Sequence, residues 1–250
     1  MEISWVEGVL LASVRLALGI AFTPLLTTFA VPRLARLVFV LSLAMLAAGS
    51  VSLPQLASGQ ARPWFLLFAA AHEVALGLLL GLGVHAAFAA FSIGGRLIDT
   101  QMGFALGAVF DPASNHHSTI TSSGFNFLAV LFFFAADVHH LLLAAYFRSF
   151  ELVPLGRPIE PAGWFPMVQG AGSMFTLGFL VASPVVVALW LADVVLGVLS
   201  RNMPQMNVMF LGFPVKVMLG LSILAASMGL MEPLFQKVLM LPVLLVDRVR

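Results

Sequence analysis

The residues of this chain whose types could do chemistry are a few ionisable side chains inside strongly apolar stretches. They are Arg15, Glu73, Asp193 and Lys216, with Asp137 near the end of its stretch. Ionisable groups inside a membrane are costly, usually face protein or water, and by default indicate function. A proton or ion path is one interpretation. The alternative, which we favour because no carboxylates recur on one helical face, is that they pair at subunit contacts or point into the interior of an assembly.

Histidines offer a second possible chemistry, metal binding. His72 and Glu73 begin like a zinc-protease helix, but Leu76 stands where the second histidine of an HExxH motif would be. The adjacent pairs His116-His117 and His139-His140 cannot both point to one site on a regular helix. A metal site would therefore need residues from distant parts of the chain, and we predict none.

Signs of catalysis or of a cofactor are also missing from the sequence. It contains no GxSxG elbow, no P-loop and no GxGxxG turn. Cysteine is absent, which excludes a thiolate nucleophile and disulfide bonds. The formal net charge of +1 gives no reason to expect nucleic acid as a partner. We expect a protein that is not an enzyme and that has no cofactor.

The composition predicts the kind of secondary structure in which these residues lie. Hydrophobic residues make up 61% of the 250 residues and charged residues 9%, whereas a soluble domain carries about 25% charged residues. Backbone polar groups in an apolar medium need partners within their own segment, which favours helices. The apolar stretches show none of the alternation of a lipid-facing barrel. We predict an all-α protein with one domain over residues 1–250.

Six long apolar segments are predicted to be helices: Val9 to Ala30, Leu37 to Leu53, Trp64 to Ile93, Phe125 to Tyr146, Met167 to Leu199 and Met206 to Met231. A shorter seventh runs from Pro233 to Val246. Pro24 and Pro184 should kink or split their segments. Lys and Arg nearly balance between the two sets of loops, unlike the usual cytoplasmic excess. We therefore expect some segments to be bent hairpins packed in a larger helical, membrane-associated assembly.

One segment, Arg96 to Pro112, is poorly suited to a plain membrane span. It reads RLIDTQMGFALGAVFDP and is followed by the polar, uncharged stretch ASNHHSTITSS. Gly103 and Gly107 leave room for close packing, and the chain breaks at Asp111-Pro112. Bulk comes from Met102, Phe104, Val109 and Phe110. An apolar collar beside a flexible polar loop could close a channel.

Together with two later stretches, this segment resembles the FliR family. The residues that carry the resemblance are Gly95 with Asp99-Thr100-Gln101-Met102-Gly103, Phe110-Asp111-Pro112, Ser149-Phe150 with Pro154-Leu155-Gly156, and Pro204-Gln205-Met206-Asn207 with Gly212-Phe213-Pro214. FliR proteins belong to the flagellar export gate and are related to the T-type gate subunit of virulence type III secretion systems. The sequence around Gly212-Phe213-Pro214 resembles the flagellar proteins more than the virulence-type proteins.

The resemblance implies a gating role at named positions. A loop of this subunit plugs the closed gate, and here it would run from Met102 to about Thr119. The apolar seal would be Met102, Phe104, Val109 and Phe110, the hinges Gly103 and Gly107, and the turn Asp111-Pro112. Residues expected to serve assembly and packing are Asp99, Gln101, Pro204, Gln205, Asn207, Gly212 and Pro214.

The resemblance also implies partners and a location. The partners are the P-type and Q-type gate subunits (FliP and FliQ), with the B-type switch protein (FlhB) and the A-type gate protein (FlhA) nearby. Unfolded export substrates would cross the channel, at the bacterial inner membrane and the base of a flagellum or injectisome. The strongest competitor is a freestanding transporter or channel that uses Glu73, Asp137 and Asp193 along a path.

Overall fold

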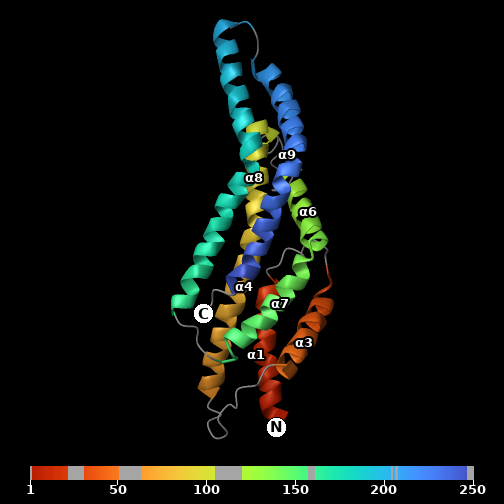
Figure 1. The fold of residues 1–250 in the computed structure, drawn as a ribbon, viewed down its shortest axis with the longest axis vertical. Helices are drawn as coiled ribbons and strands as arrows, with labels where there is room; N and C mark the ends of the chain where they lie inside the picture. Colours follow the sequence, from red (N-terminus) through yellow and green to blue (C-terminus); the bar gives the residue numbers. More distant parts are fainter. Residues whose placement is uncertain are drawn as a thin grey trace. The chain divides into compact units, whose positions relative to one another are not determined.

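A computed structural model of the chain describes residues 2–21, 31–50, 63–104, 120–156, 161–203, 205 and 208–246. Within these ranges all regular elements are helices and there is no strand, so the all-α prediction is confirmed (Figure 1). The helices are α1 (Glu2–Ala21), α3 (Arg33–Ser50), α4 (Pro63–Met102), α6 (Ile120–Ala135), α7 (Val138–Leu152), α8 (Pro161–Asn202) and α9 (Val208–Val246).

Several of the expected segment ends differ from the structure, and two of the differences change where predicted site residues lie. The third segment was expected to end at Ile93, but α4 continues to Met102. The sixth and the short seventh segment form one helix, α9, which contains Pro214 and Pro233. Arg96, Asp99 and Gln101 therefore lie on the last turns of a long helix. A polar residue need not end a helix when its side chain has hydrogen-bond partners. The Asp99 carboxylate has such partners on α6.

Pro184 lies inside α8 and does not split it. A proline cannot donate a backbone hydrogen bond to the carbonyl four residues earlier, here that of Leu180. The hydroxyl of Ser183 donates to this carbonyl at 2.8 Å instead. Neighbouring hydroxyls commonly satisfy the carbonyls that prolines leave open in membrane helices. Pro24, where we also expected an interruption, lies outside the described residues.

The fourth predicted segment, Phe125 to Tyr146, is divided into two helices. α6 ends at Ala135 and α7 begins at Val138, with Asp137 between them at φ 55° and ψ 21°. This left-handed conformation is unfavourable for most residues, but aspartate tolerates it. Asp137 thus sits in a backbone break and not in the interior of a helix.

The chain packs into two compact units, each with its own core. The first unit comprises Met1–Ala87, Asp137–Ser173 and Leu239–Arg250. In it α1 and α3 lie side by side (Figure 1), and the side chains of Leu16, Tyr146 and Phe150 are almost fully buried. The single domain expected for residues 1–250 stays a prediction.

The second unit comprises Phe88–Ala136 and Met174–Val238. Its core contains a group of aromatic rings around Phe235, whose centroid lies 4.4 Å from that of Phe91 and 5.3 Å from that of Phe132. Tilted aromatic pairs at such distances add stabilisation beyond the burial of their area. The group joins the parts of α4, α6 and α9 that belong to this unit.

Three helical stretches are long and apolar enough to cross a membrane: Leu66–Met102, Val168–Asn202 and Phe210–Leu244. The broken pair α6 and α7 makes a fourth if it is one span. The two stretches in α8 and α9 bury only 28% and 17% of their most apolar windows within the chain. Apolar surface of this extent must be covered by lipid or by other proteins.

Candidate functional site

The candidate site lies in the second unit, at the two ends of the predicted plug segment. α4 ends at Met102, and Gly103 follows with φ 88° and donates its N–H to the carbonyl of Thr100 at 3.2 Å. A glycine adopts this positive φ without steric cost and commonly terminates helices. The chain therefore leaves α4 at a fixed turn. Phe104 is the last residue of the segment that the structure describes, and the described chain resumes at Ile120, the start of α6.

Asp99 ties these two ends together. Its carboxylate accepts hydrogen bonds from the backbone N–H groups of Thr121 at 3.2 Å and of Ser122 at 3.1 Å. Both donors belong to the first turn of α6, whose N–H groups have no partner within the helix. The negative charge of Asp99 also suits the positive end of the helix dipole. Asp99, which is fully buried, thus caps α6 from the neighbouring helix α4.

A close backbone approach supports this cap. A Cβ atom on Gly95 would lie 2.7 Å from the backbone nitrogen of Ser122, so only glycine allows α4 and α6 to come this near. The Ser122 hydroxyl donates to the carbonyl of Ser92 at 3.1 Å. The Asn126 amide nitrogen donates to the Ser92 hydroxyl oxygen at 2.9 Å. The polar groups on this contact face are therefore paired with one another.

Ser92, Ser122 and Asn126 were not predicted from the sequence. A signal for them exists, because Ser92, Gly95 and Asp99 are spaced three and four residues apart and so share one helical face. It was overlooked because the helix was expected to end at Ile93, before most of this face begins.

Met102 and Phe104 attach the end of α4 to α9. Met102 is fully buried, and its side chain occupies the space left by Gly220, where a Cβ atom would lie 3.1 Å from the Met102 Cγ. The rings of Phe104 and Phe213 meet edge to face, with centroids 6.2 Å apart. Two apolar residues of the predicted seal therefore contact α9, Met102 fully buried and Phe104 half-buried.

The other residues of the predicted site fall in different places. Gly107, Val109, Phe110, Asp111 and Pro112 lie outside the described residues, as do Pro204 and Asn207. Gln101 is half-buried on α4, and Gln205 is exposed in a turn between α8 and α9. Gly212 is buried and Pro214 exposed on α9. A Cβ atom on Gly212 would lie 3.3 Å from Leu196 Cδ1.

Arg15 and Glu73 form a second polar centre, in the first unit. Both side chains are fully buried, and Arg15 donates from Nε to Oε2 of Glu73 at 2.6 Å and from Nη2 to Oε1 at 3.1 Å. Gly156 N–H also donates to Oε1 at 3.1 Å. We expected such charges at subunit contacts, but this pair is satisfied within the chain. Both carboxylate oxygens are engaged, which fits a structural ion pair and not an ion path.

Arg15 also caps the end of α7. Its Nη1 and Nη2 atoms donate to the backbone carbonyls of Ser149 and Val153, each at 3.0 Å. The guanidinium carbon lies 4.4 Å from the centre of the Phe150 ring. Carbonyls at a helix end lack partners and carry partial negative charge, so a cation stabilises them. The family motif of Ser149-Phe150 and Pro154-Leu155-Gly156 is therefore held by one buried arginine.

The other ionisable residues noted within or near the apolar stretches, Asp137, Asp193 and Lys216, also have nearby partners. Lys216 on α9 forms an ion pair with Asp193 on α8, again within the chain. Asp137, His139 and His140 lie together, which corrects our expectation that metal ligands would have to come from distant parts of the chain. The expectation assumed a regular helix, but these residues occupy the break before α7 and its first turn.

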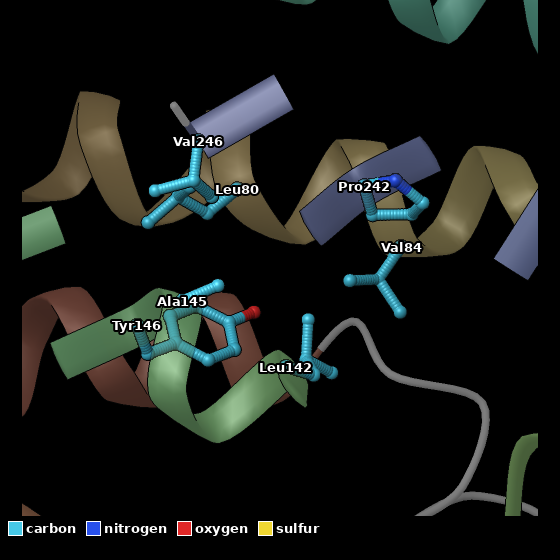
Figure 2. A pocket seen from close by; sticks show the side chains of 7 residues that line it. All are labelled: Leu80, Val84, Leu142, Ala145, Tyr146, Pro242 and Val246. Atoms are coloured by element: carbon cyan, nitrogen blue, oxygen red, sulfur yellow. The ribbon is translucent and has the colours of Figure 1, made fainter. Parts of the chain in front are cut away.

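A small apolar hollow in the first unit contains a buried hydroxyl. Figure 2 shows Leu142, Ala145 and Tyr146 of α7 facing Leu80 and Val84 of α4 and Pro242 and Val246 of α9. The Tyr146 hydroxyl is buried and has no hydrogen-bond partner among the described residues. Gly19 makes room for this ring, because a Cβ atom there would lie 2.6 Å from Tyr146 Cε1. Apart from Tyr146, the residues that line the hollow are apolar.

These features define an all-α, strongly apolar protein with helices long and apolar enough to cross a membrane, and with α4 joined to α6 across the predicted plug segment. Residues 6–241 match the family described as "Bacterial export proteins, family 1". The chain therefore belongs to the FliR family of bacterial export proteins, as the resemblance indicated.

Individual relatives agree with this assignment. The chain is 30% identical to flagellar biosynthetic protein FliR of Bacillus subtilis (strain 168) over 225 residues, 88% of this chain and 85% of the relative. It is 27% identical to FliR of Escherichia coli (strain K12) over 234 residues, 92% and 88% of the two chains. The secretion system apparatus protein SsaT of Salmonella typhimurium is 28% identical over 158 residues, 62% and 61%. These relatives indicate a component of a flagellar export apparatus.

Proposed function

We propose that this chain is a non-enzymatic subunit of the type III protein export gate, in a flagellar system, and that the segment from Met102 to about Thr119 plugs the closed channel. The proposal rests on membership of the FliR family. The structural observation that carries it is the anchoring of this segment, with Asp99 before it bonded to Thr121 and Ser122 after it.

Anchored ends suit a plug that must open and close many times. The Asp99 cap holds the start of α6 against the end of α4, so the segment leaves and returns at neighbouring points. The segment between them can then move without separating the two helices. Gly103, at the exit, already has a backbone conformation outside the helical region.

The composition of the segment suits a deformable seal. Phe104 and Phe110 would exclude water from a constriction, as hydrophobic gates do, while the buried Met102 holds the start of the segment against Gly220. Glycine lets the backbone move aside without steric cost. Such a closure can admit an extended chain yet hold back ions in its absence.

Assembly with other subunits follows from the exposed apolar surface. Phe210 and Met218 on α9 are 84% and 71% exposed, and Leu191 on α8 is 64% exposed. We propose that FliP and FliQ cover much of this surface, with FlhB and FlhA as further neighbours. The complex would lie at the bacterial inner membrane, and unfolded export substrates would pass through it. No nucleic acid or cofactor takes part.

Co-purification tests the assembly part of the proposal. The chain is expressed with its native neighbours, extracted in mild detergent and weighed by native mass spectrometry. A large complex with two kinds of small, hydrophobic helical partner is the expected result. A stable monomer or homodimer that binds a small solute or ion would contradict it and would favour the transporter. A variant with an added charge, Met218→Asp, should weaken the complex, whereas the uncharged Met218→Leu at the same exposed position should not.

A further inference from the structure

We propose that Asp137, His139 and His140 form a binding site for Zn²⁺ at the start of α7, with a water molecule completing the coordination. One ligand atom from each residue can be chosen so that all three lie within 4.8 Å of one another. Nδ1 of His140 and Oδ1 of Asp137 are 3.5 Å apart. In a tetrahedral zinc site, with bonds of about 2.0–2.2 Å, neighbouring ligand atoms lie about 3.3 Å apart. Small side-chain rotations would therefore bring the three donors to an ion.

The backbone break makes this convergence possible. Asp137 occupies the N-cap position of α7, where an aspartate normally accepts a hydrogen bond from a backbone N–H of the first turn. Its side chain makes no such bond here. Its carbonyl accepts from the N–H of His140 at 3.1 Å, so the backbone starts the helix without the carboxylate. The carboxylate is consequently directed to His140 and is available as a ligand.

The rings of the two adjacent histidines lie close together. Their centroids are 4.0 Å apart, with 39° between the ring planes. Two imidazoles and one carboxylate are a ligand set that zinc uses in sites with an open fourth position. Magnesium and calcium prefer oxygen ligands and should be excluded. The side chains of Asp137 and His140 are 75% and 71% exposed and His139 is half-buried, so an ion can approach from the side of Asp137 and His140.

An ordinary surface ion pair is the simpler interpretation of the same residues. A protonated His140 beside Asp137 would form such a pair, three residues apart. That pair would not require His139, and exposed pairs contribute little to stability. The helix N-terminus is also a poor place for a cation, although the carboxylate of Asp137 counters this. The contribution of His139 therefore distinguishes the two interpretations.

Bound zinc would fix the break before α7. It would link Asp137, in the left-handed conformation, to two residues in the first turn of the helix. Local opening of this turn would then require loss of the ion. The site thus predicts a measurable change in hydrogen exchange around residues 136–141 when zinc is added. It is independent of the plug assignment and can fail without affecting it.

The experiment uses the full chain purified in detergent with a tag that contains no histidine. Zinc is removed with a chelator and then titrated back, with binding followed by calorimetry. One ion per chain is expected, and Asp137→Asn, His139→Ala and His140→Ala should each weaken binding by at least about tenfold, as for sites that lose a ligand or its support. Two control variants should bind zinc as wild type does. One is the double variant His116→Asn/His117→Asn at the other histidine pair, and the second is His85→Ala at an exposed position of α4.

Several outcomes would overturn the site. No binding, or equal binding by His139→Ala and wild type, would leave only an Asp137–His140 pair. Loss of binding in the His116-His117 variant alone would place the ion elsewhere. X-ray absorption provides a check that does not depend on variants folding, since it should show two imidazole nitrogens and two oxygens around the metal. A hydrogen-exchange pattern unchanged by zinc at residues 136–141 would also contradict the site.

Discussion

Asp99 on α4 and Ser122 on α6 are joined by a hydrogen bond from the Ser122 N–H to the Asp99 carboxylate at 3.1 Å, although they are separated by the whole predicted plug segment. Thr121 N–H makes the equivalent bond at 3.2 Å. One buried side chain therefore joins the helix before the segment to the helix after it. A plug whose ends change position would seal poorly. We therefore expect the Asp99–Ser122 hydrogen bond to contribute to gating as well as to stability.

Replacing Asp99 by Ala should destabilise the chain by about 1–3 kcal/mol, because two buried N–H groups lose their acceptor. Asp99→Asn keeps one acceptor oxygen and should cost less. Thr100→Ala is the matched control, because Thr100 is exposed and its hydroxyl donates to the Arg96 carbonyl of the same helix. The midpoint of thermal unfolding in detergent measures the effect. Similar midpoints for Asp99→Ala and Thr100→Ala would contradict the capping role.

Glycines on α4 and α6 should respond in opposite directions to alanine. Gly95→Ala places a Cβ atom against the backbone of Ser122, so the two helices must separate and stability should fall. Gly124→Ala on α6 meets nothing within 4 Å and should raise helix stability by about 0.5–1 kcal/mol. Thermal unfolding of the two variants tests the difference. A Gly95→Ala protein as stable as wild type would mean that the close approach of α4 and α6 is not required.

Removal of one partner of the Arg15–Glu73 pair should be severe. Glu73→Ala leaves the Arg15 charge buried without its carboxylate, and such losses cost about 3–5 kcal/mol. Asp193→Ala is the control, because the side chains of Asp193 and Lys216 are 42% and 21% exposed and solvent-screened pairs contribute less than about 1 kcal/mol. The yield of folded protein and the unfolding midpoint should fall far more for Glu73→Ala. Equal losses of stability in Glu73→Ala and Asp193→Ala would contradict a larger contribution of the buried pair.

The buried hydroxyl of Tyr146 leads to a prediction of the opposite sign. Tyr146→Phe removes a hydroxyl that has no partner among the described residues, so it should leave stability unchanged or raise it by about 1 kcal/mol. Tyr146→Ala would instead leave a cavity beside Gly19 and should destabilise the chain strongly. Unfolding midpoints of the two variants separate these effects. A clear loss in Tyr146→Phe would indicate that the hydroxyl is bonded.

The sequence was sufficient for the all-α class and for the approximate position of each helix, because long apolar runs in an apolar medium can only be helices. It was insufficient at helix ends. Asp99 was expected beyond the end of its helix, yet α4 continues through it because its carboxylate finds partners on α6. Those partners depend on tertiary packing. The break at Asp137 likewise has neither Gly nor Pro to predict it.

The polar centres were recognised only in part. An arginine and a glutamate in apolar stretches had to be paired with something, and this much followed from the cost of burying charge. The sequence did not identify Glu73 as the partner of Arg15, because many charged residues are compatible with the rule and the two are 58 positions apart. The roles of Ser149 and Val153 could not be foreseen at all, since they act through backbone carbonyls.

Ion conductance of the assembled gate tests the central claim most directly. We would compare wild type with Gly107→Asp and with deletion of Phe104 to Phe110, and use Gly107→Ala as the matched variant without a charge. Native mass spectrometry would first show that each complex is intact. If the segment is the plug, the charged variant and the deletion should leak ions, and Gly107→Ala should stay nearly tight. Unchanged conductance in intact complexes of both disruptive variants would contradict the plug assignment.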